Sequence, residues 1–192
     1  MDAVEALRVG RPVLLPTDGV YGLCCALDEA AARQLYALKG RSARQPTALI
    51  AASVGVLADL LPELDAQARA IVTALLPGPY TLILANPARR FGWITGERPT
   101  TIGVRVALMP AATQRVLDAV GAVAATSAND PGEPSPARLD AVPAAIRSGV
   151  GAEIDGGTLS GLASTVIDFT GPRPVVLREG AGSVADALRC VA

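Results

Sequence analysis

Residues 13–52 read VLLPTDGVYGLCCALDEAAARQLYALKGRSARQPTALIAA and contain two short apolar runs with a helical pattern between them. The runs at residues 13–15 and 48–52 are typical of buried strands. Asp28 is a suitable N-cap for a helix whose apolar stripe is formed by Leu27, Ala31, Leu35 and Leu38. Gly40 follows where a C-terminal cap is expected. Strands that alternate with helices in this way indicate a layered α/β domain.

The remainder of the chain continues the same alternation. Further helices are expected from Asp65, from Pro110 to about residue 120, over residues 140–147, and after Ser183, which forms a capping box with Asp186. Further strands are expected over residues 80–85, 101–106, 123–125, 164–169 and 174–178. The last two strands are close enough for a hairpin, whereas strands separated by helices favour parallel pairs. The polar segment 89–100 is expected to be a surface loop. We therefore expect residues 1–192 to form a single α/β domain with a mixed sheet and helices on its faces.

The composition is that of a soluble globular protein. The chain has 192 residues, of which 51% are hydrophobic, and its 17 basic and 18 acidic residues give a net charge of −1. This balance does not favour strong autonomous tRNA or other RNA binding, because such proteins usually carry a clear basic excess. A local basic cluster is nevertheless formed by Arg33, Lys39, Arg41 and Arg44. No apolar stretch is long enough to span a bilayer and the N-terminus lacks a signal-like apolar segment, so we expect a cytoplasmic location and no membrane contact.

The chain contains no histidine, which removes several kinds of chemistry at once. Ser-His and Cys-His nucleophile pairs, histidine general bases and histidine zinc sites are all excluded. Its cysteines are Cys24, Cys25 and Cys190, and their spacing fits neither a disulfide framework nor a metal site. The adjacent pair Cys24 and Cys25 lies in an apolar run and is interpreted as buried packing.

Three groups of polar residues lie near the expected ends of strands and helices, where α/β sheets collect ligands. Lys39 and Arg41 flank Gly40 and could hold a polyphosphate, or could simply complement the negative end of the helix dipole. Ser127 and Asn129 follow a strand and could bind a ligand or nucleate a turn. Arg105 interrupts an apolar strand and must either face solvent or be paired, as it would be in a substrate carboxylate clamp.

The sequence contains neither of the common nucleotide-binding fingerprints. The pattern G-x-x-x-x-G-K-[ST] does not occur, and the glycines do not form G-x-G-x-x-G. No cluster of carboxylates indicates a metal site made by the protein alone. A Mg²⁺ ion held mainly by the phosphates of a bound nucleotide would need few protein ligands.

Taken together, four motifs in order resemble the YrdC-like family, which includes the threonylcarbamoyl-AMP synthases. They are PTDGVYGL at residues 16–23, K-x-R at Lys39 and Arg41, S-x-N inside TSANDPGEPSP at residues 126–136, and STVID at residues 164–168. The resemblance covers residues 13–180 and implies a single YrdC-like domain with a twisted mixed sheet and a concave positive cavity. It also implies a nucleotidyltransferase that converts L-threonine, bicarbonate and ATP into threonylcarbamoyl-AMP and pyrophosphate. Separate tRNA threonylcarbamoyl transfer proteins would then modify a tRNA adenosine.

The resemblance also implies roles for particular residues. Lys39 and Arg41 would be catalytic, and the ATP-binding residues would be Lys39, Arg41, Gln45, Thr101, Asn129 and Arg178. Arg105 would hold the amino-acid carboxylate, and the remaining substrate-binding residues would be Thr17, Tyr21, Thr126, Ser127 and Ser164. Stabilisation of charge, rather than a covalent intermediate, would supply most of the rate.

Two positions depart from the pattern of the family synthases, and both lie on the amino-acid side. Gly19 stands where those synthases usually have threonine, and Ile50 stands where they usually have histidine. Two alternatives therefore stay open. The chain could be a non-catalytic paralog that binds nucleotide or RNA, or it could form a carbamoyl-adenylate from another amine.

Overall fold

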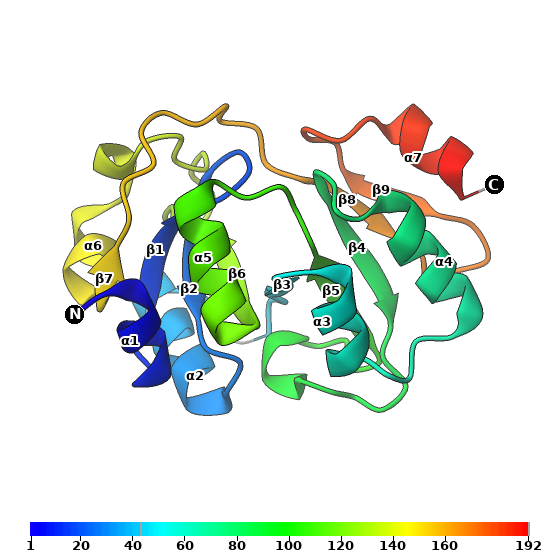
Figure 1. Cartoon of the computed structure of the whole chain (residues 1–192), viewed down its shortest axis with the longest axis horizontal. Helices are drawn as coiled ribbons and strands as arrows, with labels where there is room; N and C mark the ends of the chain where they lie inside the picture. The colour runs from blue at the N-terminus through cyan, green and yellow to red at the C-terminus, as the bar shows by residue number, and fades with distance from the viewer. Residues whose placement is uncertain (43, 192) are drawn as a thin grey trace.

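One continuous nine-stranded sheet runs through the computed structural model, which describes residues 1–42 and 44–191 (Figure 1). The strands lie in the order β7-β1-β2-β6-β3-β5-β4-β8-β9. Their bounds are β1 (Val13–Pro16), β2 (Tyr21–Cys25), β3 (Ala48–Ala51), β4 (Tyr80–Ala85), β5 (Thr101–Arg105), β6 (Ala122–Ser127), β7 (Ala152–Glu153), β8 (Thr165–Asp168) and β9 (Val175–Arg178).

The sheet is mixed, which confirms the fold expected from the sequence. Strand β1 pairs antiparallel with β2, which pairs antiparallel with β6, and β3 also runs antiparallel to β6. The pairs β1–β7, β3–β5 and β4–β8 are parallel, while β4–β5 is antiparallel. The expected hairpin is present as β8 and β9, with an irregularity between Val166 and Ile167.

Helices cover both faces of the sheet, and α2, α4 and α7 begin at the predicted caps Asp28, Asp65 and Ser183, whereas the helix expected over residues 140–147 lies at 144–149. They are α1 (Ala3–Arg8), α2 (Glu29–Lys39), α3 (Val54–Leu60), α4 (Ala66–Leu75), α5 (Ala111–Val120), α6 (Ala144–Gly149) and α7 (Val184–Cys190). The Asp28 carboxylate accepts a hydrogen bond from the Ala31 N–H, which starts α2. Gly40 ends the same helix with a φ of 63°, a left-handed conformation that glycine adopts without a steric penalty. Residues at its two ends therefore fix where α2 begins and where it stops.

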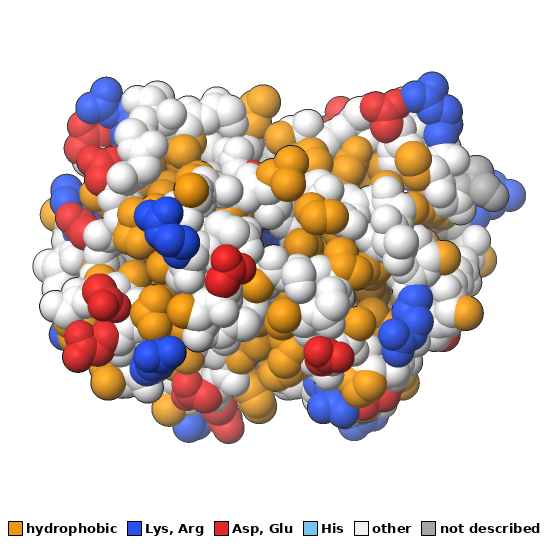
Figure 2. All heavy atoms as spheres, viewed as in Figure 1, with side chains coloured by type: hydrophobic (Ala, Val, Ile, Leu, Met, Phe, Trp, Pro, Cys, Tyr) orange, Lys and Arg blue, Asp and Glu red, His pale blue; other side chains and the backbone are white. Residues whose placement is uncertain are grey.

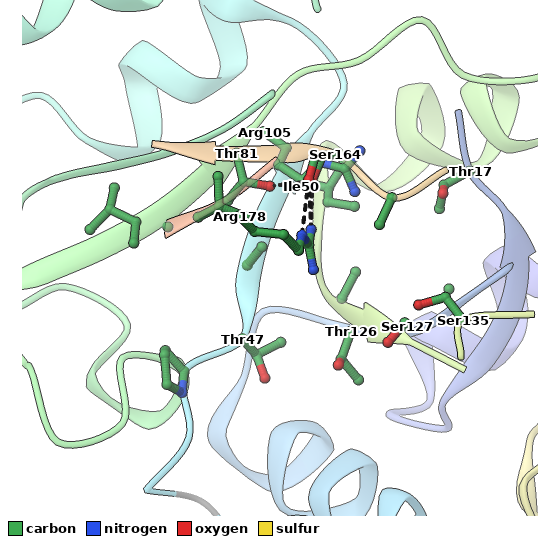
Figure 3. Close-up of a pocket in the computed structure, with 18 of the residues that line it drawn as sticks. Thr17, Thr47, Ile50, Thr81, Arg105, Thr126, Ser127, Ser135, Ser164 and Arg178 are labelled. Atoms are coloured by element: carbon green, nitrogen blue, oxygen red, sulfur yellow. Dashed lines mark hydrogen bonds between the residues drawn. The ribbon is translucent and has the colours of Figure 1, made fainter. Parts of the chain in front are cut away.

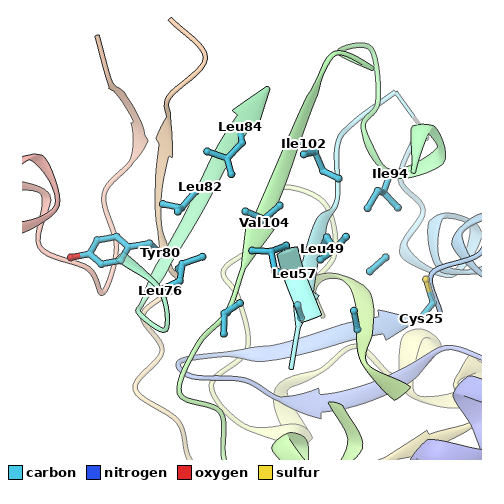
Figure 4. Close-up of a cluster of buried hydrophobic side chains, with 14 of the residues drawn as sticks. Cys25, Leu49, Leu57, Leu76, Tyr80, Leu82, Leu84, Ile94, Ile102 and Val104 are labelled. Atoms are coloured by element: carbon cyan, nitrogen blue, oxygen red, sulfur yellow. The ribbon is translucent and has the colours of Figure 1, made fainter. Parts of the chain in front are cut away.

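Alternate residues of the central strands point to opposite faces of the sheet. Leu49, Leu82 and Val104 point into the larger buried cluster (Figure 4), to which α2, α3, α4, α6 and α7 also contribute. The opposite face carries a smaller cluster in which Ile50 and Val123 pack with α1 and α5. Helices α1 and α5 cover only the part of this face that carries the smaller cluster. The rest of the face is left open for a cavity.

The structure differs from the sequence prediction at β2. No strand was expected within the motif PTDGVYGL, but its second half begins an interior strand between β1 and β6. All five residues of β2 are buried, so the alternation of polar and apolar side chains that marks a half-buried strand is missing. The buried packing expected for Cys24 and Cys25 is confirmed, and burial raises the pKa of the Cys24 thiol to about 12.

Short elements were also missed. Helices α1 and α3 and the two-residue strand β7 were not expected. Each is short, and helices of this length are stable only through tertiary packing, which local periodicity does not report. Within the expected loop 89–100, residues Gly92–Ile94 form one 3-10 turn, and Ile94 is buried in the larger cluster.

Candidate functional site

A cavity of about 560 Å³ lies over the uncovered part of the sheet. Residues two apart on neighbouring strands form its floor, because side chains with a period of two share one face. The floor residues are Ile50 of β3, Thr81 and Ile83 of β4, Gly103 and Arg105 of β5, and Val166 of β8. Their sequence neighbours Leu49, Leu82, Val104 and Ile167 belong to the larger core cluster on the other face. The cavity is thus a direct product of strand alternation where no helix covers the sheet.

Arg178 and Ser164 form the first polar group in this cavity (Figure 3). The Arg178 guanidinium donates from Nε and Nη2 to the Ser164 carbonyl at 3.1 and 2.8 Å, and from Nη2 to Ser164 Oγ at 3.2 Å. Ser164 Oγ also lies 2.8 Å from Thr81 Oγ1. Burial, assisted by the nearby Arg105 cation, lowers the pKa of Arg178. A guanidinium remains protonated at neutral pH even with a lowered pKa, so this group supplies a fixed positive charge.

Arg105 is buried and paired with Asp18 rather than turned to solvent. Its Nη2 donates to Asp18 Oδ1 at 2.6 Å, and only 9% of the residue is exposed. Within the described residues, Arg105 Nε is buried without a hydrogen-bond acceptor. A buried donor that lacks a partner is costly unless a ligand or water satisfies it. Both members of this pair line the cavity.

Arg41 also lines the cavity and is anchored by three hydrogen bonds. Its Nη1 donates to Thr126 Oγ1 at 2.8 Å, Nη2 to the Pro46 carbonyl at 2.9 Å and Nε to Gln45 Oε1 at 2.9 Å. Burial lowers the pKa of the Arg41 guanidinium. The loop after α2 therefore presents a rigidly held cation to the end of β6.

Lys39 lies behind this wall, at the end of α2. Its ammonium donates to the Ser127 carbonyl at 2.6 Å, to Asn129 Oδ1 at 2.9 Å and to the Asn129 carbonyl. Only 4% of the residue is exposed. Burial and, to a lesser extent, the nearby Arg41 cation lower the pKa of Lys39 to about 8, against the opposing effect of the Asp130 carboxylate.

The structure brings most of the predicted site residues together around one cavity. The predicted site residues that line this cavity are Thr17, Arg41, Thr101, Arg105, Thr126, Ser127, Ser164 and Arg178. Lys39, Gln45 and Asn129 are not among the lining residues, although each contacts a residue that is. Arg41 and Arg178, which are far apart in sequence, share this cleft, as the predicted polyanion site requires.

Tyr21, predicted to bind substrate, is not among the residues that line the cavity. Tyr21 is fully buried in the larger core cluster. Its hydroxyl lies 3.0 Å from Asp155 Oδ1 and 2.9 Å from the Gly157 carbonyl, and it accepts from the Gly156 N–H. Strand alternation turns Tyr21 to the face opposite the cavity, because its neighbour Gly22 is the residue that lines it. Tyr21 thus anchors the turn at residues 155–157.

Several lining residues were not singled out from the sequence. Asp18 contacts the predicted residue Arg105, Thr81 contacts the predicted residue Ser164, and Thr47, Ser135 and Leu162 also line the cavity. Thr81 could have been found from the period of two in β4, because it shares a face with Ile83. Asp18 lies within the motif PTDGVYGL, and the other three lie in connections whose path depends on tertiary contacts, so no local pattern marks those three.

Of the two positions that depart from the family motifs, Ile50 lines the cavity, and Gly19 lies in sequence between the lining residues Asp18 and Val20. Ile50 lines the floor and gives it an apolar surface. At Gly19, a Cβ atom would lie 1.9 Å from the Leu162 carbonyl oxygen, so the present path of residues 160–162 leaves no room for a side chain. The Gly161 N–H donates to the Gly19 carbonyl at 2.9 Å, which holds the two segments together. Glycine is therefore required here by close packing of two backbones.

A mixed sheet with five arginines, among them Arg41, Arg105 and Arg178 from distant segments, around one cavity defines an α/β protein with a binding site for a small anionic molecule. The Sua5/YciO/YrdC family model, described as "Telomere recombination", matches residues 5–180, and the chain belongs to this family.

Named relatives and solved structures agree with this assignment. The threonylcarbamoyl-AMP synthase of Halorhodospira halophila is 38% identical over 182 residues, which are 93% of this chain and 88% of that protein. The structure of Pyrococcus abyssi Sua5 complexed with L-threonine matches with a TM-score of 0.84 and 33% identity over 98% of this chain. The present chain spans only 56% of that Sua5 chain. Escherichia coli YciO matches with a TM-score of 0.83 and 30% identity, covering 97% of this chain and 91% of that one.

Proposed function

We propose that this chain is an enzyme that makes threonylcarbamoyl-AMP from L-threonine, bicarbonate and ATP, with release of pyrophosphate. The observation that carries the proposal is the convergence of Arg41, Arg105 and Arg178 on one cavity of about 560 Å³. The names of the relatives and the L-threonine complex of P. abyssi Sua5 support the same reaction.

The reaction has two steps that bring anions together. The threonine amine condenses with bicarbonate to give a carbamate and water. A carbamate oxygen then forms a bond to the α-phosphorus of ATP, and the bond from that phosphorus to the bridging oxygen of pyrophosphate breaks. Carbamate and triphosphate repel each other, so fixed cations that offset both charges lower the barrier. Such a mechanism needs positioning more than a nucleophile, in keeping with a chain that has no histidine.

The arginines suit different parts of the reactants. Arg41 and Arg178 would bind the triphosphate, since each is anchored by neighbours while part of its guanidinium faces the cavity. Arg105 would bind the threonine carboxylate through its unpaired Nε and remaining donors. Hydroxyl groups of Thr101, Ser127 and Ser164 would complete the contacts.

The remaining partners of the reaction follow from its chemistry. Within the described residues, no group of three or more His, Cys, Asp or Glu side chains could hold a metal ion. Mg²⁺ would therefore enter with ATP and be held chiefly by phosphate oxygens and water. The threonylcarbamoyl group would pass to separate proteins that modify tRNA. On the face shown in Figure 2, cationic and anionic side chains are interspersed without a continuous basic area, which fits weak direct RNA binding.

No helix in the described part of the chain is long and apolar enough to cross a membrane.

A second candidate is the same chemistry with a different amine. Ile50 gives the cavity an apolar wall, and the 160–162 segment lies against Gly19 beside Asp18 and Arg105. An apolar wall favours alkyl side chains but discriminates weakly against an added hydroxyl group.

The test is direct. The protein is incubated with ATP, Mg²⁺, bicarbonate and L-threonine, and both the AMP-linked product and pyrophosphate are measured. Arg178→Ala and Arg41→Ala should reduce the rate at least tenfold, because each removes a phosphate-side cation. Arg33→Ala, a change at an exposed pair on α2, is the control and should leave the rate unchanged. Absence of both products with the wild-type protein would refute synthesis from threonine, and a panel of other amino acids would then test the second candidate.

A further inference from the structure

The lysine of the K-x-R motif has no hydrogen-bond donor left for a ligand. A lysine ammonium carries three N–H groups. The structure gives Lys39 three acceptors: the Ser127 carbonyl, the Asn129 carbonyl and Asn129 Oδ1. Together with its 4% exposure, this leaves the ammonium fully enclosed by protein oxygens. A phosphate could replace one of these partners only by leaving a buried carbonyl unsatisfied, which is costly.

The amide group of the Asn129 side chain is also fully hydrogen-bonded within the protein. Its Oδ1 accepts from Lys39 and from Ser127 Oγ, the latter at 2.5 Å. Its Nδ2 donates to the carbonyls of Asp130 at 2.8 Å and Glu133 at 2.6 Å. Both amide donors and both oxygen lone pairs therefore have partners inside the protein. Asn129 ties the end of β6 to the turn that follows it.

In contrast to Lys39 and Asn129, the arginines Arg41, Arg105 and Arg178 keep hydrogen-bond donors that the described part of the protein does not use. A guanidinium carries five N–H groups. Arg178 directs Nε and Nη2 to Ser164, Arg41 directs one donor from each nitrogen to the protein, and Arg105 directs only Nη2. Within the described residues each of the three keeps N–H groups free, and each lines the cavity, whereas Lys39 does neither.

We infer that Lys39 and Asn129 are positioning residues that hold the segment 126–133 in place, and that the triphosphate is bound by the arginines. This rests on the proposed function for its ligand but departs from the expectation that Lys39 binds ATP. The carbonyl oxygens of Ser127 and Asn129 point at one spot beside the cavity. Without the Lys39 cation their partial negative charges would repel a triphosphate, and the chain carrying Thr126 and Ser127 would lose its anchor.

The first measurement compares the binding of AMP and ATP. Substitution of a lysine that contacts the β- and γ-phosphates weakens the binding of ATP far more than that of AMP. Substitution of a lysine that only shapes the cavity wall weakens the binding of both. Lys39→Met should weaken AMP and ATP by factors that agree within about threefold. Arg178→Ala, the matched phosphate-side control, should weaken ATP at least tenfold more than AMP.

The second measurement needs no nucleotide. Amide hydrogen exchange of Ala128 and Glu133, whose N–H groups bond to the Tyr21 and Asp130 carbonyls, reports the order of the segment. Exchange should be at least tenfold faster in Lys39→Met and in Asn129→Ala, and unchanged in Arg178→Ala. The double variant Lys39→Met with Asn129→Ala should lose little more affinity than the worse single variant, because the two residues act as one unit.

The outcomes separate this inference from the proposed function. If Lys39→Met loses ATP binding at least tenfold more than AMP binding, with exchange unchanged, Lys39 is a phosphate ligand and the inference is wrong. If the wild-type protein binds neither nucleotide, the proposed function fails while the exchange data still decide the positioning role. If Lys39→Met does not fold, Asn129→Ala replaces it in the nucleotide-binding and amide-exchange measurements, with the same expected results.

Discussion

The buried Arg105 shows how one residue can be ambiguous in a sequence and clear in a structure. In the sequence, a charge between Val104 and Val106 could face water or a partner. In the structure it faces the cavity, with 11% of its side chain exposed, and pairs with Asp18, whose side chain is 15% exposed. A pair at this depth differs from surface pairs, because the partners have given up most of their hydration.

Removing the partner should therefore be costly. Asp18→Ala leaves the Arg105 cation buried without its counter-charge, and we expect the free energy of unfolding to fall by about 3 kcal/mol. Arg138→Met breaks the exposed pair with Asp140 and should cost under about 1 kcal/mol. Urea denaturation of both variants checks the contrast. Equal small losses would show that the Asp18–Arg105 pair contributes no more than a surface pair.

The enclosed ammonium of Lys39 has a consequence for pH dependence. Burial and Arg41 lower its pKa from 10.5 to about 8, so between these values the unfolded chain binds more protons at this position than the folded chain. Stability at this site then rises with pH, because stability increases wherever the unfolded state binds more protons. The wild-type free energy of unfolding minus that of Lys39→Met should increase from pH 8 toward pH 10. A flat or falling difference would contradict the lowered pKa.

At the scale of elements, the segment 155–164 has no regular structure yet forms part of the cavity wall. It is held by the Tyr21 hydroxyl near Asp155, by the Leu159 N–H bonded to the Ala137 carbonyl, and by the Gly161 N–H bonded to the Gly19 carbonyl. Leu162, more than half exposed, lines the cavity from this segment. The turn between β1 and β2 and this segment therefore act as one unit.

A side chain at position 19 should separate the two parts of that unit. Gly19→Ala places a methyl group 1.9 Å from the Leu162 carbonyl oxygen, so one backbone must move. We expect a loss of about 1–3 kcal/mol in the free energy of unfolding, the usual cost of overpacking, and faster amide exchange at Gly161. Gly171→Ala is the control, since its Cβ would meet no atom closer than 3.7 Å. Unchanged stability and exchange at Gly19→Ala would show that the segment yields freely.

For the whole molecule, the continuous sheet and the larger core cluster predict one cooperative unit. The cluster joins Leu14 of β1 and Leu35 of α2 at one end to Tyr80 of β4 and Ala187 of α7 at the other. Trp93, the only tryptophan, packs against the same cluster. Unfolding followed by Trp93 fluorescence and by far-UV circular dichroism should therefore give the same midpoint. Two separate midpoints would show that the ends of the sheet unfold independently.

The sequence alone determined the features that depend on neighbouring residues. The caps at Asp28 and Gly40, the alternation of strands with helices and the β8–β9 hairpin are set by local backbone preferences and by hydrophobic period, so they could be predicted. Strand β2 could not, because a strand buried on both faces carries no alternation, and the short helices α1 and α3 depend on packing.

Only the tertiary structure decided which polar groups share a site and which serve the fold. Lys39 and Arg41 are two residues apart, yet the first is enclosed by carbonyl oxygens and the second faces the cavity. Asp18 meets Arg105, and Gly19 meets Leu162, across long stretches of sequence. The physical reason is that hydrogen bonding, burial and charge pairing depend on distance in space, while motif spacing records only distance along the chain.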